Sequence, residues 1–328
     1  MQTNEYLTPD SIRNIANSFQ QSRIILTAIE LEIFTVLDKH LMQSEDVAQK
    51  INCDPRAVNR LMNALVALGF LRKVHGKFYN TETSAKYLIK GKPEYMGNLD
   101  HTNNLWDSWS TLTEAVRHGK SVLDRPRKND NREDFIAAMH YRAQREAKII
   151  SLMLDLNNVN KMLDIGGGSG AFTYEFMSVN PNMKGVIFDL PNIIPITKKY
   201  ADQYQLGNRL NFIEGDYLVD QFGNGYDLIL LSAIVHINSY EQNKELIKKC
   251  SDSLNAGGQI IIRDFIMNDD RTEPANAAMF SLNMLVGTEY GDTYTESEMK
   301  EWFINSGINQ VIRKDTGFGS NLLIGIKK

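Results

Sequence analysis

The sequence predicts an α/β protein whose seven-stranded sheet is mostly parallel, with one antiparallel strand, preceded by a mainly α-helical winged-helix domain. Short apolar strands and amphipathic helices alternate from residue 161 onward, a glycine-rich turn joins the first of these strands to its helix, and two short helices with a hairpin lie at 44–85. Such alternation implies right-handed crossovers and a parallel sheet with helices on both faces. With 328 residues the chain has room for about two domains, which we expect at 1–95 and 96–328, with linking helices at 96–150.

Composition and charge exclude several classes of protein. A net charge of −4 and a pI near 5.9 give no electrostatic reason to expect nucleic acid or a membrane as a partner. Cys53 and Cys250 are too few and too far apart for a disulfide framework or a thiolate metal site, so we expect no metal and a reducing cytoplasm. No signal peptide is visible in the first five residues, and no apolar run is long enough to span a membrane.

The first element is a helical pattern that begins at Thr8-Pro-Asp10 and runs through Ile12, Ile15 and Phe19 to Leu37. Its apolar residues present more surface than a lone pair of N-terminal helices can bury. We therefore expect this segment to pack against a partner chain, which makes the protein a homodimer.

A winged helix-turn-helix follows. Ser44-Glu-Asp-Val47 predicts a capping box that opens a short helix, and Asp54 with Pro55 predicts the start of a second helix, which ends at Gly69. The strands 70–74 and 77–79, joined by His75-Gly76, then predict a small hairpin.

This motif raises the question of DNA binding. The second helix carries Arg56, Asn59, Arg60 and Asn63 at helical spacing, but residues 1–95 hold only 12 Lys and Arg against 10 Asp and Glu. A phosphate-reading surface shows a clear basic stripe. The sequence therefore favours a domain used for association over one that binds nucleic acid.

The stretch between the domains contains Trp106 and Trp109, which are either core residues or the wall of a substrate pocket. After it, the spacing of apolar residues predicts one long helix over 135–156 that leads into the glycine strand.

The glycine turn is Lys161-Met-Leu-Asp-Ile-Gly-Gly-Gly-Ser-Gly-Ala-Phe172. Gly166, Gly168 and Gly170 let the backbone turn tightly and approach a ligand closely. The pattern also fits a dinucleotide fingerprint, but Asp164 would repel a phosphate and attract an ammonium or sulfonium group. S-adenosylmethionine carries both cations and no phosphate, so we expect it as the cofactor.

Further strands are expected at 185–190, 210–216, 227–234 and 258–266, helices at 191–205, 238–254 and 295–306, and a closing hairpin of strands at 310–314 and 322–327. Ligands of such sheets bind at the carboxyl ends of the strands, where acids are informative.

Asp189 ends the second strand, where it could accept both ribose hydroxyls, and Asp216 ends the third, where it could accept from an adenine amino group. Tyr217 or Phe188 could stack on the adenine ring. The expected donor site is completed by Leu190 and Ser232.

His236 and Asp264 stand at the ends of the fourth and fifth strands, which we expect to be neighbours. A neutral histidine can accept the proton of a phenol, and a carboxylate on its other nitrogen would fix its tautomer. The same two residues could equally be a satisfied pair with only a structural role.

With these motifs, the sequence resembles the plant-type small-molecule O-methyltransferases and their bacterial relatives. The resemblance covers almost the whole chain and rests on Leu163-Asp-Ile-Gly-Gly-Gly-Ser-Gly170, Phe188-Asp-Leu-Pro191, Glu214-Gly-Asp216, Ile234-Val-His236 and Thr295-Glu-Ser-Glu-Met299.

The resemblance implies a class I methyltransferase fold with a Rossmann-like sheet and a winged-helix dimerisation domain. It implies that the glycine turn and Asp164 hold the methionine end of S-adenosylmethionine, that Asp189 holds the ribose and that Asp216 holds the adenine. Asp264 matches one of the family's catalytic acids. Met139 resembles a methionine beside the methyl-transfer site, and Asn283 and Met284 fall in the substrate-lining helix.

The chain also departs from the family pattern. Plant members commonly have His-Asp-Trp where this chain has His236-Ile-Asn238, and a second acidic residue is replaced by Thr293 or Tyr294.

We expect transfer of a methyl group from S-adenosylmethionine to a hydroxyl of a small, aromatic acceptor, leaving S-adenosylhomocysteine. The sequence leaves two alternatives open. One is a ligand-sensing winged-helix regulator with a degenerate methyltransferase domain, and the other is a nicotinamide-dependent oxidoreductase.

Overall fold

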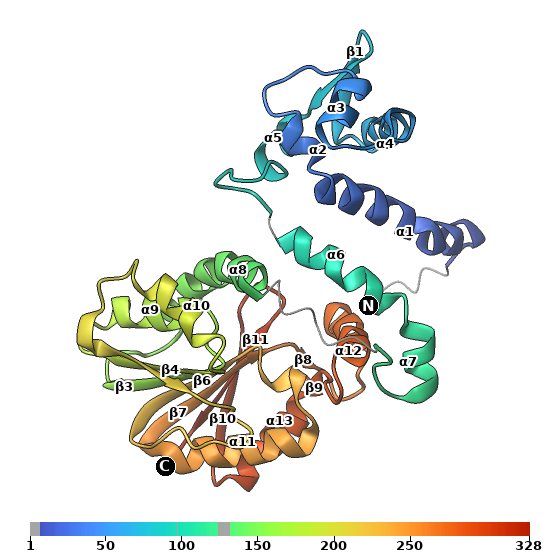
Figure 1. Cartoon of the computed structure of the whole chain (residues 1–328). Coiled ribbons are helices and arrows are strands. Elements are labelled where there is room, and N and C mark those ends of the chain that lie inside the picture. The colour runs from blue at the N-terminus through green and yellow to red at the C-terminus, as the bar shows by residue number, and fades with distance from the viewer. Residues whose placement is uncertain (1–6, 97, 124–131) are drawn as a thin grey trace. The chain divides into compact units, whose positions relative to one another are not determined.

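The computed structural model describes residues 7–96, 98–123 and 132–328, and the chain divides into two compact units, Met1–Trp106 and Asp107–Lys328. The division falls inside helix α6 (Asn98–Trp109) (Figure 1). Among the helices of the described residues, none combines the length and the apolar character needed to cross a membrane.

The N-terminal unit is mainly helical and contains the expected hairpin. Its elements in order are α1 (Pro9–Glu30), α2 (Ile33–Val36), α3 (Ser44–Lys50), α4 (Pro55–Ala67), β1 (Leu71–Val74), β2 (Lys77–Asn80) and α5 (Glu82–Tyr87). Antiparallel β1 and β2 close a core around the fully buried side chains of Phe34, Met62 and Phe78. This is the winged-helix arrangement predicted for residues 44–85.

The caps of the two short helices have different outcomes. Asp54 caps α4 as predicted, because its side chain accepts a hydrogen bond of 2.8 Å from the amide of Ala57. The capping box predicted at Ser44 is wrong, since Gln43 is the N-cap of α3 and makes no side-chain cap bond. Ser44 is buried in the first turn, and its hydroxyl accepts a hydrogen bond from Asn59 of α4 instead.

Helix α1 presents large apolar side chains to solvent. Ile12, Ile15 and Phe19 are all more than half exposed, whereas Leu26 and Ile29 near the end of the helix are buried. The exposed apolar surface expected from the sequence is therefore present within this unit.

The second unit contains the predicted sheet (Figure 1). Its remaining elements are α7 (Leu112–His118), α8 (Arg132–Met153), β3 (Lys161–Ile165), α9 (Ala171–Val179), β4 (Lys184–Asp189), α10 (Ile194–Ala201), η2 (Gly207–Arg209), β5 (Leu210–Glu214), β6 (Tyr226–Ser232), η3 (Val235–Ile237), α11 (Tyr240–Ser253), β7 (Leu254–Asp264), β8 (Ile266–Met267), α12 (Ala275–Gly287), β9 (Tyr294–Thr295), α13 (Glu296–Asn305), β10 (Gln310–Asp315) and β11 (Asn321–Ile326).

The strand order of the large sheet is β10-β11-β7-β6-β3-β4-β5. Strand β11 runs in the direction opposite to the other six strands of this sheet. The predicted seven-stranded, mostly parallel sheet is confirmed. The chain runs from β3 outward to β4 and β5 and then crosses to β6 on the other side of β3. Such a switch point is where open α/β sheets bind their ligands, beyond the carboxyl ends of the strands.

The two faces of the sheet carry different cores, because side chains alternate along each strand. Leu163, Ile229 and Ile262 pack on the side of α11 and α13. Met162, Leu230 and Ile261 pack on the other side, against α8 and α9. The side chains at the carboxyl ends of the strands therefore fall into two groups, one on each face of the sheet.

Candidate active site

The site begins where β3 ends in the glycine turn. Gly166, Gly168 and Gly170 have φ angles of 65°, 56° and 80°, in the left-handed region that favours glycine. A Cβ atom at Gly166 would lie 2.3 Å from the side chain of Ile234, and one at Gly170 would lie 2.5 Å from the ring of Tyr174. The turn therefore needs glycine for both its backbone conformation and its packing.

Asp164 lies buried beneath this turn. Its carboxylate accepts a hydrogen bond of 2.7 Å from the hydroxyl of Thr173, and it has no cationic partner among the described residues. Burial, with a smaller contribution from the charge of Asp189, raises the pKa of Asp164 to about 7. A buried carboxylate of this kind fits a ligand that brings its own positive charge.

Asp189, at the end of β4, is tied to the same turn. One carboxylate oxygen accepts a hydrogen bond of 2.8 Å from the amide of Gly168, and the other accepts one of 2.8 Å from the amide of Leu190. Burial raises the pKa of Asp189, and these two hydrogen bonds partly offset that effect. The two acids, Asp164 and Asp189, thus lie on adjacent strands around one turn.

Asp216 and Tyr217 follow β5, on the outer side of β4. The Asp216 carboxylate accepts a hydrogen bond of 2.9 Å from the amide of Leu218. The hydroxyl of Tyr217 donates to Asn238 at 3.0 Å, and burial raises the pKa of Tyr217 to about 12. Both residues are half-buried.

His236 and Asp264 form a hydrogen-bonded pair at the ends of the neighbouring strands β6 and β7. His236 lies in the turn η3 just after β6, and its Nδ1 is 2.7 Å from Asp264 Oδ1. The side chain of Asp264 is 1% exposed and that of His236 is 12% exposed. When the carboxylate accepts a hydrogen bond from Nδ1–H, the neutral ring keeps its lone pair on Nε2.

Buried amides fix the position of the turn that carries His236. Asn243 of α11 donates a hydrogen bond of 2.8 Å to the carbonyl of Val235, and it accepts one of 3.0 Å from Asn238. The amide of Asp292 donates to the carbonyl of His236. The histidine is therefore held from both sides of its own turn.

An aromatic side chain packs against the histidine. The ring of Phe280 from α12 meets His236 edge-on with centroids 4.9 Å apart, and Phe265 lies 4.3 Å from Phe280. On the same helix, Asn283 accepts a hydrogen bond of 3.0 Å from the indole of Trp109. Phe280 and Asn283 are three residues apart on α12 and therefore lie on the same side of this helix.

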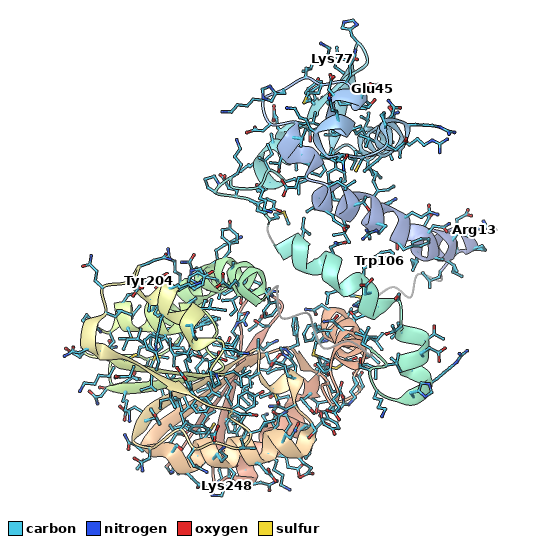
Figure 2. All side chains as sticks on the ribbon, in the orientation of Figure 1. Arg13, Glu45, Lys77, Trp106, Tyr204 and Lys248 are labelled. Atoms are coloured by element: carbon cyan, nitrogen blue, oxygen red, sulfur yellow. The ribbon has the colours of Figure 1, made fainter. Side chains whose placement is uncertain are left out.

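The other expected pocket residues differ in their surroundings. Met284 is buried within α12, and Met139 on α8 is half-buried. Trp106 belongs to the N-terminal unit, where the guanidinium of Arg23 lies 5.5 Å from its ring (Figure 2).

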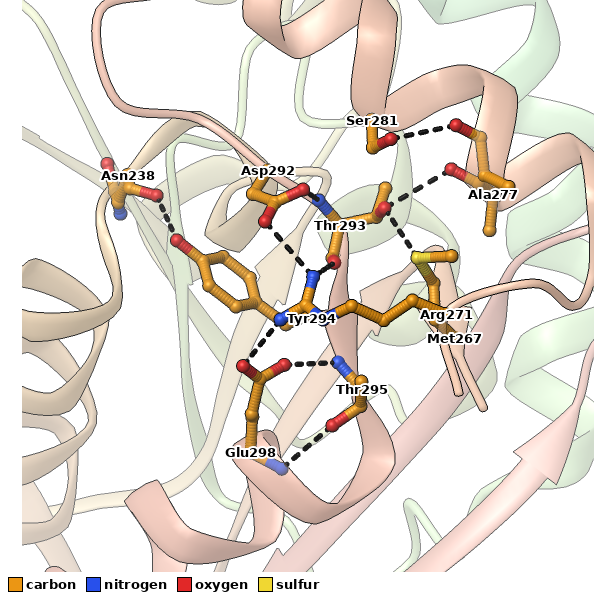
Figure 3. A network of polar contacts seen from close by, with 11 residues as sticks. Asn238, Met267, Arg271, Ala277, Ser281, Asp292, Thr293, Tyr294, Thr295 and Glu298 are labelled. Atoms are coloured by element: carbon orange, nitrogen blue, oxygen red, sulfur yellow. Dashed lines mark hydrogen bonds and ion pairs between the residues drawn. The ribbon is translucent and has the colours of Figure 1, made fainter. Parts of the chain in front are cut away.

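The position of the replaced second acid is occupied by uncharged groups (Figure 3). Thr293 is fully buried, with its hydroxyl 2.9 Å from the sulfur of Met267, and the hydroxyl of Tyr294 donates to the carbonyl of Asn238 at 2.6 Å. The nearby carboxylate of Asp292 pairs with Arg271 at 3.1 Å. Asp264 is therefore the acid that contacts His236.

Two features of this edge were not predicted. His140 of α8 lies 2.8 Å from the hydroxyl of Ser169 in the glycine turn, and burial lowers the pKa of His140. Arg263, next to Asp264 on β7, forms a buried ion pair with Glu146 of α8. The sequence signal that could have indicated this ion pair is a charged residue, Arg263, directly after the apolar run 260–262 of an expected buried strand.

The described residues contain no group of three or more histidine, cysteine or acidic side chains arranged to hold a metal ion.

Comparison with known proteins gives consistent results along the whole chain. The family model of the O-methyltransferase dimerisation domain matches residues 14–90, and that of the O-methyltransferase domain matches residues 109–309.

Relatives match at moderate identity over nearly their full length. The 3-hydroxy-5-methyl-1-naphthoate 3-O-methyltransferase of Streptomyces sahachiroi is 29% identical, over 97% of this chain and 95% of that protein. An S-adenosyl-L-methionine-dependent methyl transferase of Serratia sp. is 26% identical, over 98% and 97%. The structure of an O-methyltransferase family protein from Burkholderia thailandensis superposes with a TM-score of 0.88 at 26% identity, covering 98% of each chain.

Both parts of the family's architecture are present, in the same order and over most of the chain, so this protein belongs to the O-methyltransferase family.

Proposed function

We propose that this enzyme transfers a methyl group from S-adenosylmethionine to a hydroxyl of a small aromatic acceptor, and that His236 takes the proton of that hydroxyl. The observation that carries the proposal is the arrangement at the carboxyl edge of the sheet. Under the glycine turn lies the buried carboxylate of Asp164, which has no cationic partner in the part of the chain that the structure describes, and His236, paired with Asp264, follows the strand next to it.

The donor site is formed by the turn and the strand-end acids. The carboxylate of Asp164 attracts the positive charge of the donor's methionine end, Asp189 accepts from the ribose hydroxyls, and Asp216 accepts from the adenine amino group. Tyr217, Leu190 and Ser232 line the same edge. Bound S-adenosylmethionine supplies an electrophilic methyl group on a sulfonium.

The transfer is an in-line displacement. The acceptor oxygen forms a bond to the methyl carbon as the carbon–sulfur bond breaks, so the sulfur keeps the electron pair and becomes neutral. His236 Nε2 takes the hydroxyl proton, and Asp264 stabilises the resulting imidazolium. Alignment and exclusion of water supply the rest of the rate enhancement.

The acceptor is a flat ring that packs on Phe280 and Phe265, with Met139, Met284 and Asn283 around it. The relative from S. sahachiroi is named for a hydroxylated naphthoate acceptor, which has this chemistry. Incubation with methyl-labelled S-adenosylmethionine and a panel of hydroxylated aromatic acids, followed by mass spectrometry of labelled products, tests the reaction. Labelled ethers support it, and a product labelled only on nitrogen or carbon contradicts it.

The working unit is a homodimer formed through the N-terminal unit, without nucleic acid or membrane as a partner. The dimerisation-domain match and the exposed apolar residues of α1 support this assembly. We place the enzyme in the cytoplasm, in keeping with its free cysteines.

Replacement of Asp189 by Ala should weaken binding of S-adenosylhomocysteine well over tenfold, because one or two charge-assisted hydrogen bonds of about 1.5–3 kcal/mol each are lost. Isothermal calorimetry measures this. Asp227→Ala is the matched control, since Asp227 also accepts two backbone hydrogen bonds, from Asn160 and Lys161, but at the opposite edge of the sheet. Equal affinities of the two variants would exclude the ribose assignment.

The raised pKa of Asp164 gives a prediction about stability and pH. Its folded pKa of about 7 is above the ordinary value of 3.8, so the folded state binds the extra proton. This stabilising contribution is complete below about pH 4 and is lost as the pH rises through 7, by up to about 4 kcal/mol. Asp164→Asn should therefore raise the melting temperature of the ligand-free enzyme more at pH 8 than at pH 5.

The same substitution should weaken binding of S-adenosylhomocysteine at pH 8, since a neutral amide attracts an ammonium group less strongly than a carboxylate does. If the melting temperatures of the wild-type enzyme and of Asp164→Asn fall in parallel between pH 5 and pH 8, Asp164 is not the titrating group.

His236→Ala should lower the turnover number by about a hundredfold or more and leave the affinity for S-adenosylhomocysteine unchanged, because general-base catalysis typically contributes 10²–10⁴-fold. The loss should shrink at high pH and with acceptors of low pKa. His118→Ala is a suitable control, since His118 also lies beside a carboxylate, Glu114, but on the exposed surface of α7. Near-normal turnover of His236→Ala on the identified acceptor would show that another group takes the proton.

The protein should sediment as a dimer at micromolar concentration. Ile15→Ser together with Phe19→Ser should shift it toward the monomer, because both side chains are exposed within the isolated unit. Ile304→Ser on α13 removes an isoleucine of similar exposure and should leave the dimer intact. A wild-type monomer with full activity would overturn the assembly.

A further inference from the structure

Arg263 is a buried guanidinium with unused hydrogen-bonding capacity. The residue is 8% exposed, its Nη1 lies 3.3 Å from the hydroxyl of Ser232, and its Nη2 pairs with Glu146. Its Nε is buried and has no hydrogen-bond partner among the described residues. Leaving a charged donor buried and unpaired costs free energy, so an arginine with only a structural role would be expected to use all of its donors.

The sheet register places this cation on the donor side of the site. Arg263 is opposite Ser232 in the pairing of β7 with β6, and Leu230, two residues earlier on β6, is opposite Asp164 of β3. Residues paired in this way, or two apart on one strand, share a face. Asp164, Ser232 and Arg263 therefore lie at the carboxyl edge on the face that α8 and α9 cover.

The guanidinium also lies close to the glycine turn. Its central carbon is 5.3 Å from the centre of the Phe172 ring, and Phe172 is the second residue of α9, directly after Gly170 and Ala171. The long side chain of Arg263 thus brings positive charge from β7 back across the edge toward the turn.

The charged groups that act on Arg263 are Arg142, Glu146 and Asp264. Glu146 is shared between Arg263 and Arg142, whose Nε lies 2.7 Å from the other carboxylate oxygen. Burial, and then repulsion from Arg142, lower the pKa of Arg263 to about 10, and attraction to Asp264 partly offsets these two effects. An anion bound beside the guanidinium would relieve both effects.

The methionine end of S-adenosylmethionine carries an ammonium and a carboxylate on one carbon. Asp164 provides an anion for the ammonium, and the carboxylate needs a cation on the same face of the sheet. We propose that Arg263, with the hydroxyl of Ser232 beside it, binds this carboxylate. The assignment rests on the proposed donor site and adds to it the group that recognises the acidic end of the donor.

A pair of ligands that differ by one group tests the assignment. S-adenosylhomocysteine carries the carboxylate, and its decarboxylated analogue, 5′-deoxy-5′-(3-aminopropylthio)adenosine, keeps the amine and lacks the carboxylate. Calorimetry with the full-length enzyme gives both dissociation constants for wild type and for Arg263→Gln. The substitution should weaken S-adenosylhomocysteine binding about tenfold to a hundredfold, the effect of losing charge-assisted hydrogen bonds, and should change the analogue's affinity by less than about threefold.

Matched variants separate this role from a structural one. Arg263→Lys keeps the charge and should lose less affinity for S-adenosylhomocysteine than Arg263→Gln does. Arg313 lies on the outermost strand, β10, and also pairs with a carboxylate, that of Glu296. Arg313→Gln should leave the dissociation constants of both ligands unchanged. If Arg263→Gln does not fold because it leaves Glu146 buried with fewer partners, the double variant Arg263→Gln/Glu146→Gln removes both charges and is judged by the same comparison.

Equal losses for the two ligands, or an unchanged constant for S-adenosylhomocysteine, would overturn the role of Arg263 while leaving the donor site in place. Failure of the wild-type enzyme to bind either ligand would instead contradict the proposed function itself.

Discussion

The burial of charge at one edge of a parallel sheet is the constraint on which the rest of this site depends. Asp164 and Arg263 are both buried on the same face, and among the described residues Asp164 has no cationic partner and Arg263 Nε has no hydrogen-bond acceptor. Burial of an incompletely paired ion is unfavourable, so the fold must hold these groups in place by other means. The glycine turn, the hydroxyl of Thr173 and the Glu146 ion pair supply that support.

Much of the fold could be predicted because its signals are local. Apolar runs predict the strands, the three glycines predict a turn with left-handed backbone, and Asp54 caps its helix through a bond to a residue three positions away. The strand-end acids also follow, since parallel strands bring their carboxyl ends to one edge. Whether Asp164, Asp189 and Asp216 bind the donor remains a prediction that only ligand binding can test.

Other features could not be predicted because they depend on long-range packing. Arg263 and Glu146 are separated by 117 residues, and His140 and Ser169 by 29, so no periodicity relates them. The failed capping box has the same cause, because the hydroxyl of Ser44 is used by Asn59 of the next helix rather than by its own backbone. In each case a local pattern is overridden by a contact that only the folded chain creates.

The paired charges around the methionine end also constrain how the enzyme can work. The ammonium and carboxylate are the same in donor and product, so contacts to them bind both species equally and cannot by themselves accelerate the transfer. In the proposed reaction the sulfonium changes, because it loses its charge as His236 gains one. If Asp164 and Arg263 bind the methionine end as proposed, their contacts serve to fix the position of the methyl group, and stabilisation of the transition state must come from the edge near β6 and β7. The side chain of Asp264 is 1% exposed and hydrogen-bonded to His236, so its carboxylate is placed to stabilise that new positive charge.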